Sequence, residues 1–248
     1  MAKIIFLGTA NAVPNKDHES AHLVIDVGRR LILVDCAGNP VMRLDQAGID
    51  LLTITDLVLT HFHPDHVVGL PLLLMDMWLM GRAEPLHIYG LSVVIDRVLK
   101  LLDLFDWADW DGLYPVVFHR LPDTEQVPLI DIEHVRLWAS PVCHSVPAIG
   151  IRLWTPEGTL CYSSDTGPCE AVVRLARDVD VLIHEATGEG SGHTSPAGAG
   201  RIAQQAGVEK LVLIHYPLNV DLDEWVSEAN STFDGEVFAA RDFMEIEI

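Results

Sequence analysis

Lysine, paired cysteines and long apolar runs are all scarce in this sequence of 248 residues. Sixteen lysines and arginines, only four of them lysine, stand against 36 acids and leave a formal charge of −20. Affinity for nucleic acid comes largely from cationic contacts to phosphates, so this balance argues against a large polyanionic partner. A local positive site on an acidic body stays compatible with it.

The apolar runs are short and interrupted. The longest, at residues 67–81, contains Pro71 and Asp76 and is too short to span a bilayer. The N-terminal stretch MAKIIFLGTANAVP has an apolar run of only four residues and no small-residue cleavage site, unlike a signal peptide. We therefore expect a cytoplasmic protein without a membrane segment.

No two of the four cysteines form a CxxC pair. Disulfides are rare in a reducing compartment, so we expect four buried thiols. The cysteines are Cys36, Cys143, Cys161 and Cys169.

The order of the predicted elements favours an α/β protein. Strand-like runs at 3–8, 22–28 and 30–36 are typical of an antiparallel meander. Later strands alternate with expected helices at 39–49, 67–81, 92–105, 169–177 and 201–207, whereas the aromatic and acidic stretch 106–119 fits neither pattern. Strands followed by helices, twice over, predict two packed sheets flanked by helices. No linker divides the chain, so we expect a single domain over residues 1–248.

One short motif carries most of the chemical signal. The strand-like run TDLVLT leads into HFHPDH, which places His61, His63, Asp65 and His66 within six residues. On an extended segment His61 and His63 point to the same side, so both can bind one ion. Asp65 and His66 follow Pro64 and can serve a second ion. Imidazole and carboxylate ligands suit zinc, and also iron or manganese.

Three further candidate ligands occupy equivalent positions in the sequence. Each follows an apolar strand-like run and precedes a turn, which would bring all of them to one edge of the sheets. They are His144 in PVCHSVP, Asp165 in YSSDTGP and His215 in LIHYP.

The pattern HxHxDH, followed by a distant histidine, an aspartate and a last histidine, resembles the metallo-β-lactamase superfamily over nearly the whole chain. The resemblance implies a four-layer αβ/βα sandwich and two divalent metal ions, with zinc the first expectation. It implies that one ion is held by His61, His63 and His144, and the other by Asp65, His66 and His215. Asp165 would bridge the two ions. A hydroxide shared by the ions would attack the substrate, and Asp65 would orient or deprotonate that nucleophile.

Several segments resemble the ribonuclease Z branch of that superfamily: FLGTANAVP, PLHIYG, SSDTGP, IHEAT and GHTSPAGAG. The resemblance implies a phosphodiesterase in which Glu185 orients His193, and His193 assists the leaving oxygen. The same residues also fit a plain structural loop, with Thr194 or Ser195 as the N-cap of a helix that begins at Pro196. His184, which precedes Glu185 on a strand, should face the other way.

The sequence departs from a tRNA-processing ribonuclease Z in three places. The arm that this branch carries between the equivalents of His144 and Asp165 is replaced by a short hairpin. The turn after the DC strand reads DCAGNP, and the arginine usually found after the last histidine is missing from HYPLNVDL. We therefore predict a small phosphodiester or ester-like substrate and regard tRNA as doubtful.

Two sets of alternatives stay open. The same metal site also fits a lactonase, a thioesterase or another carboxylic-ester or amide hydrolase, and a non-catalytic binding module is a further reading. An aromatic segment could wall a substrate pocket or lie in a homodimer interface: Trp78, Trp107, Trp110 and Tyr114. Five other histidines match no metal motif, with His22 the one nearest to the first strands: His18, His22, His87, His119 and His134.

Overall fold

The N-terminal strands form the predicted antiparallel meander in the computed structural model, which describes residues 2–248. They are β1 (Lys3–Gly8), β2 (His22–Asp26) and β3 (Leu31–Val34). Their apolar side chains pair across the strands, as at Ile4 with Ile25 and Ile25 with Ile32. β1 and β2 are separated by a long loop, whereas β2 and β3 are joined by a tight turn in which Gly28 has a φ of 77°.

The first sheet then continues with parallel strands. β4 (Asp56–Val58), β5 (Leu86–Leu91) and β6 (Val116–Leu121) extend it in the order β14-β1-β2-β3-β4-β5-β6. Helices connect these strands because parallel neighbours need a crossover. The connecting elements are α1 (Pro40–Gln46), η1 (Leu51–Thr53), α2 (Pro64–Val67), α3 (Leu70–Leu79), α4 (Ser92–Asp103) and η2 (Trp107–Asp109).

The second sheet repeats this plan. Its antiparallel half comprises β7 (Val127–Ile132), β8 (Val135–Val142), β9 (Ala148–Trp154) and β10 (Thr159–Tyr162). Its parallel half adds β11 (Val181–Glu185), β12 (Lys210–Ile214) and β13 (Glu236–Ala239). The helices of this half are α5 (Glu170–Leu175), α6 (Pro196–Ala206) and α7 (Leu222–Asn230), and β14 (Glu245–Glu247) returns to pair with β1.

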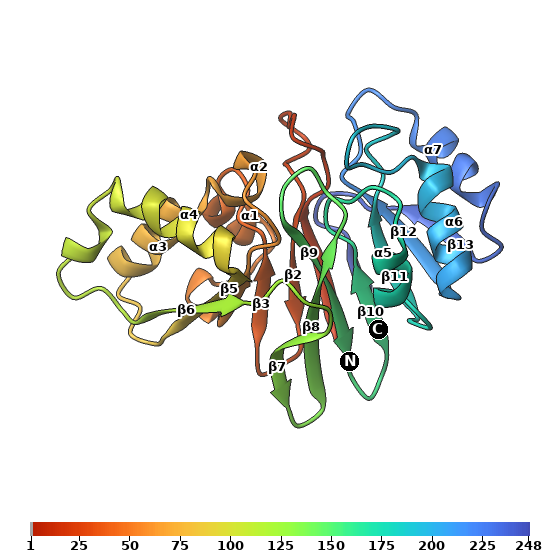
Figure 1. Cartoon of the computed structure of the whole chain (residues 1–248). Helices are drawn as coiled ribbons and strands as arrows, with labels where there is room; N and C mark the ends of the chain where they lie inside the picture. Colours follow the sequence, from red (N-terminus) through yellow and green to blue (C-terminus); the bar gives the residue numbers. More distant parts are fainter. Residues whose placement is uncertain (1) are drawn as a thin grey trace.

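The two sheets pack face to face, with α1 to α4 on one side and α5 to α7 on the other (Figure 1). The main core fills the space between the sheets and contains Ile4, Ile25, Leu137 and Ile151. A second cluster, which includes Leu182 from β11 and Ala199 and Ala203 from α6, joins the second sheet to its helices. The predicted four-layer αβ/βα sandwich is confirmed, whereas the single domain over residues 1–248 stays a prediction.

Some expected elements differ from those observed. The helix expected at 67–81 is interrupted, because α2 ends at Val67 and α3 begins at Leu70. Gly69 lies between them, where a Cβ would meet Cδ of Pro40 at 2.6 Å and the carbonyl of Cys36 at 2.9 Å. Three elements were not predicted from the sequence: α7, β13 and β14. The unassigned stretch 106–119 forms η2 and the first part of β6.

The prediction of four buried thiols is wrong for two of them. Cys36 and Cys161 are buried in the sheets, but Cys143 is exposed and Cys169 is partly exposed. Both exceptions lie in loops that follow strands, and Cys169 packs against the second cluster with only part of its surface. In residues 2–248, no helix is long and apolar enough to cross a membrane.

Candidate metal centre

The candidate ligands meet at one edge of the sandwich because each follows the carboxyl end of a strand. His61 and His63 lie in the loop after β4, and Pro64 at the first position of α2 turns the chain so that Asp65 and His66 face the same edge. The remaining three follow β8, β10 and β12 respectively: His144, Asp165 and His215. The structure thus brings together all seven residues that the sequence analysis singled out.

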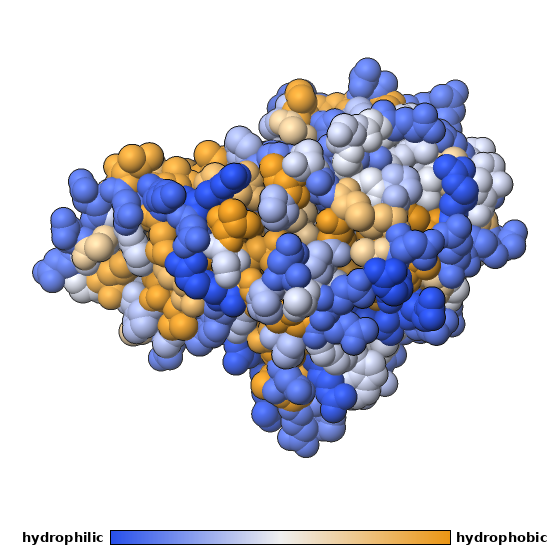
Figure 2. All heavy atoms as spheres, in the orientation of Figure 1, coloured by the Kyte–Doolittle hydropathy of each residue, from blue (hydrophilic) through white to orange (hydrophobic). Residues whose placement is uncertain are grey.

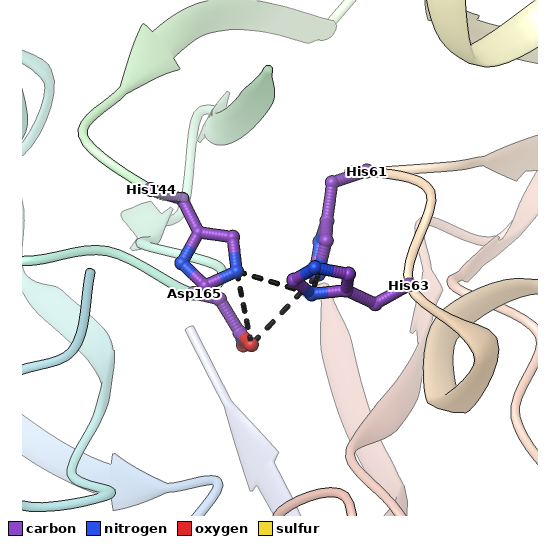
Figure 3. Close-up of side chains that lie close together, drawn as sticks. All are labelled: His61, His63, His144 and Asp165. Atoms are coloured by element: carbon purple, nitrogen blue, oxygen red, sulfur yellow. Dashed lines mark hydrogen bonds and ion pairs between the residues drawn. The ribbon is translucent and has the colours of Figure 1, made fainter. Parts of the chain in front are cut away.

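The first group contains His61, His63, His144 and Asp165 (Figure 3). Nδ1 of His63 lies 3.0 Å from Nε2 of His61 and 3.2 Å from Nε2 of His144. Oδ2 of Asp165 lies 3.8 Å from the His61 nitrogen and 3.9 Å from the His144 nitrogen. Four ligand atoms therefore converge on one point from three different loops.

The second group contains Asp65, His66 and His215. Oδ2 of Asp65 lies 3.4 Å from Nε2 of His66 and 3.7 Å from Nε2 of His215. Oδ2 of Asp165 lies 3.6 Å and 3.4 Å from the same two nitrogens. One carboxylate oxygen thus faces both groups, which is the position of a bridging ligand.

These residues fit a pair of divalent ions. Ligands about 2.0–2.1 Å from a tetrahedral zinc lie roughly 3.4 Å from one another, close to the separations found here. Among the buried side-chain atoms of the described residues, three at this site have no hydrogen-bond partner: Nε2 of His66, Nε2 of His215 and Oδ1 of Asp165. Buried polar atoms are normally satisfied, so such a cluster indicates a missing positive partner.

Hydrogen bonds fix the ring orientation of three ligand histidines through Nδ1. His66 Nδ1 lies 2.8 Å from Oδ2 of Asp35, His144 Nδ1 lies 2.8 Å from the carbonyl of Gly192, and His215 Nδ1 lies 2.8 Å from Oγ1 of Thr187. When Nδ1 carries the proton, Nε2 is left with a free lone pair for a metal.

Two of these partners, Asp35 and Thr187, were not predicted from the sequence. Asp35 is fully buried at the end of β3 and accepts hydrogen bonds from the backbone N–H and the hydroxyl of Thr60, both at 2.8 Å. Its position directly after the apolar run LILV has the same pattern as Asp165 after LCYSS, a signal that could have identified it. Thr187 offers no comparable signal, since a threonine in a glycine-rich loop is common.

Burial and charge set the protonation of the ligands. Burial lowers the pKa of His61, which keeps its imidazole neutral. Burial alone would raise the pKa of Asp165, but the neighbouring His215 and His66 hold it well below the usual value. Hydrogen bonds from His215 and His66 likewise outweigh burial and lower the pKa of Asp65. In His66, by contrast, the neighbouring Asp165 and Asp35 outweigh burial and raise the pKa. Neutral imidazole and ionised carboxylate are the forms that bind metals, and a bound cation would displace the extra proton from His66.

Glu185 and His193 form a second pair beside the ligands. Oε1 of the buried Glu185 lies 3.1 Å from Nδ1 of His193 and accepts the backbone N–H of Thr194 at 2.9 Å. This hydrogen bond raises the pKa of His193. The His193 ring is stacked on that of His215, with centroids 5.8 Å apart and an interplanar angle of 15°.

The loop that carries His193 requires a glycine at one position. Gly192 has a φ of 80°, and a Cβ there would lie 2.9 Å from Nδ1 of His144. Any larger residue would collide with His144, one of the candidate ligands. At the end of the same loop the expected N-cap is Ser195, whose hydroxyl accepts the N–H of Gly198, with Pro196 at the first helical position.

The other histidines lie outside the ligand groups. His22 is buried, with Nδ1 2.8 Å from the carbonyl of Ser20, and His184 is buried on β11 with Nδ1 2.7 Å from the carbonyl of Glu185. His87 and His119 contact each other at 2.9 Å across β5 and β6. None of them belongs to a ligand group found in residues 2–248.

The aromatic segment packs against itself. Trp78 and Trp110 are stacked, with centroids 5.4 Å apart, and Tyr114 is buried under Met77. Trp107 meets Phe118 edge to face. These contacts give no support to the pocket-wall alternative.

Solved structures share this arrangement of sheets. The metallo-β-lactamase fold protein YhfI from Bacillus subtilis superposes with a TM-score of 0.86 at 22% identity and covers 100% of this chain and 99% of its own. The short form of human tRNase Z gives a TM-score of 0.82 at 25% identity, with 99% of each chain covered. The protein therefore has the metallo-β-lactamase fold, with the four-layer sandwich and the edge cluster described above.

The family follows from the sequence comparison. The chain belongs to the family described as Anti-Pycsar protein Apyc1, which matches residues 2–233. It is also 27% identical to ribonuclease Z of Methanothermobacter thermautotrophicus over 308 aligned residues, which cover 100% of this chain and 97% of that protein. Since this chain has 248 residues, many positions of that ribonuclease Z have no counterpart here. The predicted resemblance to the ribonuclease Z branch is confirmed.

Proposed function

We propose that this protein is a metal-dependent phosphodiesterase of the ribonuclease Z-like type that hydrolyses small phosphodiesters. The observation that carries the proposal is the placement of the Glu185–His193 pair beside two groups of ligands. Ligand atoms of His193, Asp165 and His215 all lie within 4.8 Å of one another. A proton donor and a metal centre can therefore act on the same bound group.

Each residue has a role in this proposal. Divalent ions bound at these ligands would supply Lewis-acid stabilisation of negative charge and an activated water. Asp65 faces this centre and accepts a proton or orients the water. Glu185 keeps Nδ1 of His193 bonded and favours the protonated ring, so His193 donates its Nε2 proton to the leaving oxygen. Loss of that proton donor slows a reaction most when the leaving group is poor.

The short β9–β10 hairpin supports a small substrate. β9 ends at Trp154 and β10 begins at Thr159, so only four residues replace the arm that the ribonuclease Z resemblance leads one to expect. The formal charge of −20 points the same way. The smallest phosphodiesters that contain a nucleoside are cyclic nucleotides, and a compact centre without an arm has the size for them.

The first test is a hydrolysis assay with protein of known metal content. The panel contains bis(p-nitrophenyl) phosphate, cyclic nucleoside monophosphates, a precursor tRNA, a lactone and a thioester. We expect turnover of the small diesters and loss of it on chelation. His193→Ala should slow cyclic nucleotides by about 10²–10⁴-fold, the usual contribution of general acid catalysis. His134→Ala, at an exposed position whose one ionic partner within residues 2–248 is Glu133, is the matched control.

Two results of this assay would contradict the proposed function. Inert diesters together with lactone or thioester turnover would replace the phosphodiesterase assignment with the carboxylic-ester alternative. Turnover of precursor tRNA at a rate similar to that of the small diesters would overturn the proposed substrate size.

Zinc and a homodimer also belong to this proposal. Nitrogen and carboxylate ligands at these separations favour zinc over the larger manganese.

Apolar surface gathers on the side formed by α1 to α4 (Figure 2), and the exposed apolar residues there include Leu79, Met80, Leu104 and Phe105. Metal analysis and light scattering test the two statements. The cytoplasmic location stays a prediction.

A further inference from the structure

Cys143 and Cys169 lie side by side next to the metal centre. The side chain of Cys169 lies close enough to that of Cys143 to raise the pKa of the Cys143 thiol to about 11. The backbone N–H of Cys143 donates to Oγ1 of Thr166 at 3.1 Å, and its carbonyl accepts the N–H of Gly167 at 2.7 Å. The Thr166 hydroxyl also lies 4.0 Å from Sγ of Cys169. These contacts hold two separate loops together and bring the two cysteines near each other, and such proximity is the first requirement for a disulfide.

Both thiols are accessible, unlike the other two. Cys143 is exposed, and Cys169 lines a cavity of about 300 Å³ between α5 and α6. Arg201 also lines this cavity and makes no ion pair within residues 2–248. Cys36 and Cys161 have no exposed surface. A small reagent can therefore reach Cys143 and Cys169 but not the two buried cysteines.

We propose that Cys143 and Cys169 are a redox pair that forms a reversible disulfide in exchange with a low-molecular-weight disulfide. The thiolate of one cysteine attacks a sulfur of the reagent, and the first small thiol leaves and takes up the proton. The thiol of the second cysteine then displaces the remaining small thiol, which again carries the proton away. Two protein thiols are oxidised to one disulfide, and one reagent disulfide is reduced to two thiols.

The bridge would tie together two segments of the metal centre. Cys143 directly precedes His144, and Cys169 follows Asp165 by four residues in the same loop. The hydroxyl of Thr194, next to His193, donates to the carbonyl of Thr166 at 2.6 Å, so this loop also contacts the His193 loop. A covalent link between the two segments should hold their ligands in place and slow the departure of a bound ion. The inference concerns regulation and is independent of which substrate is hydrolysed.

The test treats the metal-loaded protein with oxidised glutathione. We expect two of the four thiols to disappear, a peptide pair bridged through Cys143 and Cys169 in mass spectrometry, and full recovery with a reductant. The Cys143→Ser and Cys169→Ser variants should each retain one glutathione on the remaining cysteine of the pair. Four free thiols after treatment, or a stable glutathione adduct on the wild-type pair without a bridge, would overturn the proposal.

A second measurement separates the bridge from its effect on the metal. Release of the ion to a chelator should be several-fold slower in the oxidised than in the reduced wild-type protein. The Cys169→Ser variant should release the ion at the same rate before and after treatment. A bridged protein that releases its metal as fast as the reduced one would contradict the proposed effect on the metal centre. Failure of the diesterase assay would affect neither measurement.

Discussion

Asp35 should control metal affinity although it contacts no metal ligand atom. Replacement by asparagine keeps the size of the side chain and tolerates the φ of 64° at this position, since asparagine enters the left-handed region readily. The carboxylate accepts three hydrogen bonds of 2.8 Å: from the N–H and hydroxyl of Thr60 and from Nδ1 of His66. An amide has only one accepting oxygen.

The consequence depends on which way the amide turns. If its oxygen faces the backbone N–H of Thr60, its NH₂ faces His66 Nδ1 and donates to it. The His66 proton then moves to Nε2, the atom that lies 3.4 Å from Asp65, and that nitrogen can no longer bind an ion. If the amide oxygen instead faces His66 Nδ1, the buried backbone N–H of Thr60 loses its acceptor. The loss costs about 1–3 kcal/mol. A metal can bind only in this second state, because only there is Nε2 of His66 free of a proton. The affinity for the metal should therefore fall by about 5- to 150-fold, which is the same cost expressed as an equilibrium constant. The range is similar to that of other residues that orient metal ligands.

Competition with a chromophoric chelator measures this affinity, and circular dichroism verifies the fold. Asp56→Asn is the matched control, because Asp56 is equally buried and bonded to Arg30 at 2.8 and 3.0 Å but lies away from the ligands. It should lower stability and leave metal affinity unchanged. Wild-type affinity in Asp35→Asn, or an equal loss in both variants, would refute the reasoning.

Three further predictions concern other parts of the chain. Thr187→Val removes the hydroxyl that lies 2.8 Å from Nδ1 of His215 and should weaken metal binding by about 10-fold in the same chelator assay. Burial lowers the pKa of His22 from 6.5 to about 4. Between these two pH values the unfolded chain is protonated at His22, whereas the folded protein is not. Stability should therefore fall by up to about 3 kcal/mol from pH 6.5 to 4, and urea unfolding should show a smaller fall for His22→Gln. Gly200→Ala would place a Cβ 2.4 Å from a backbone carbonyl of α7 and should cost about 1–3 kcal/mol, whereas Gly190→Ala, with open space, should be neutral.

The ligand positions could be predicted because they combine two strong local signals. His144, Asp165 and His215 each follow an apolar run, and the carboxyl ends of such strands meet at one edge. The HFHPDH motif adds a second signal, because few sites other than metal centres place three histidines and an aspartate within six residues. Sequence alone therefore indicated the candidate metal-binding edge, and the structure brings four of the histidines to within 4 Å of Asp165 there.

The residues that orient the ligands were much harder to predict. The carbonyl of Gly192 holds His144, and any residue has a carbonyl, so nothing in the sequence marks it. Thr187 reaches His215 only because β11 and β12 are parallel neighbours. The exposure of Cys143 and Cys169 was missed for a related reason: solvent access in a loop depends on how neighbouring loops pack, not on local composition.

An acidic protein can bind an anionic substrate when the charges nearest to the substrate are positive. Two divalent ions would bring four positive charges, against two negative charges from Asp65 and Asp165, while a protonated His193 would be balanced by the Glu185 carboxylate 3.1 Å away. Screening confines this local field to about 8 Å at physiological salt. A small diester fits within that distance and experiences mainly the positive centre. A folded RNA extends far beyond it and meets a body whose formal charge is −20, so the charge distribution supports the proposal of a small substrate.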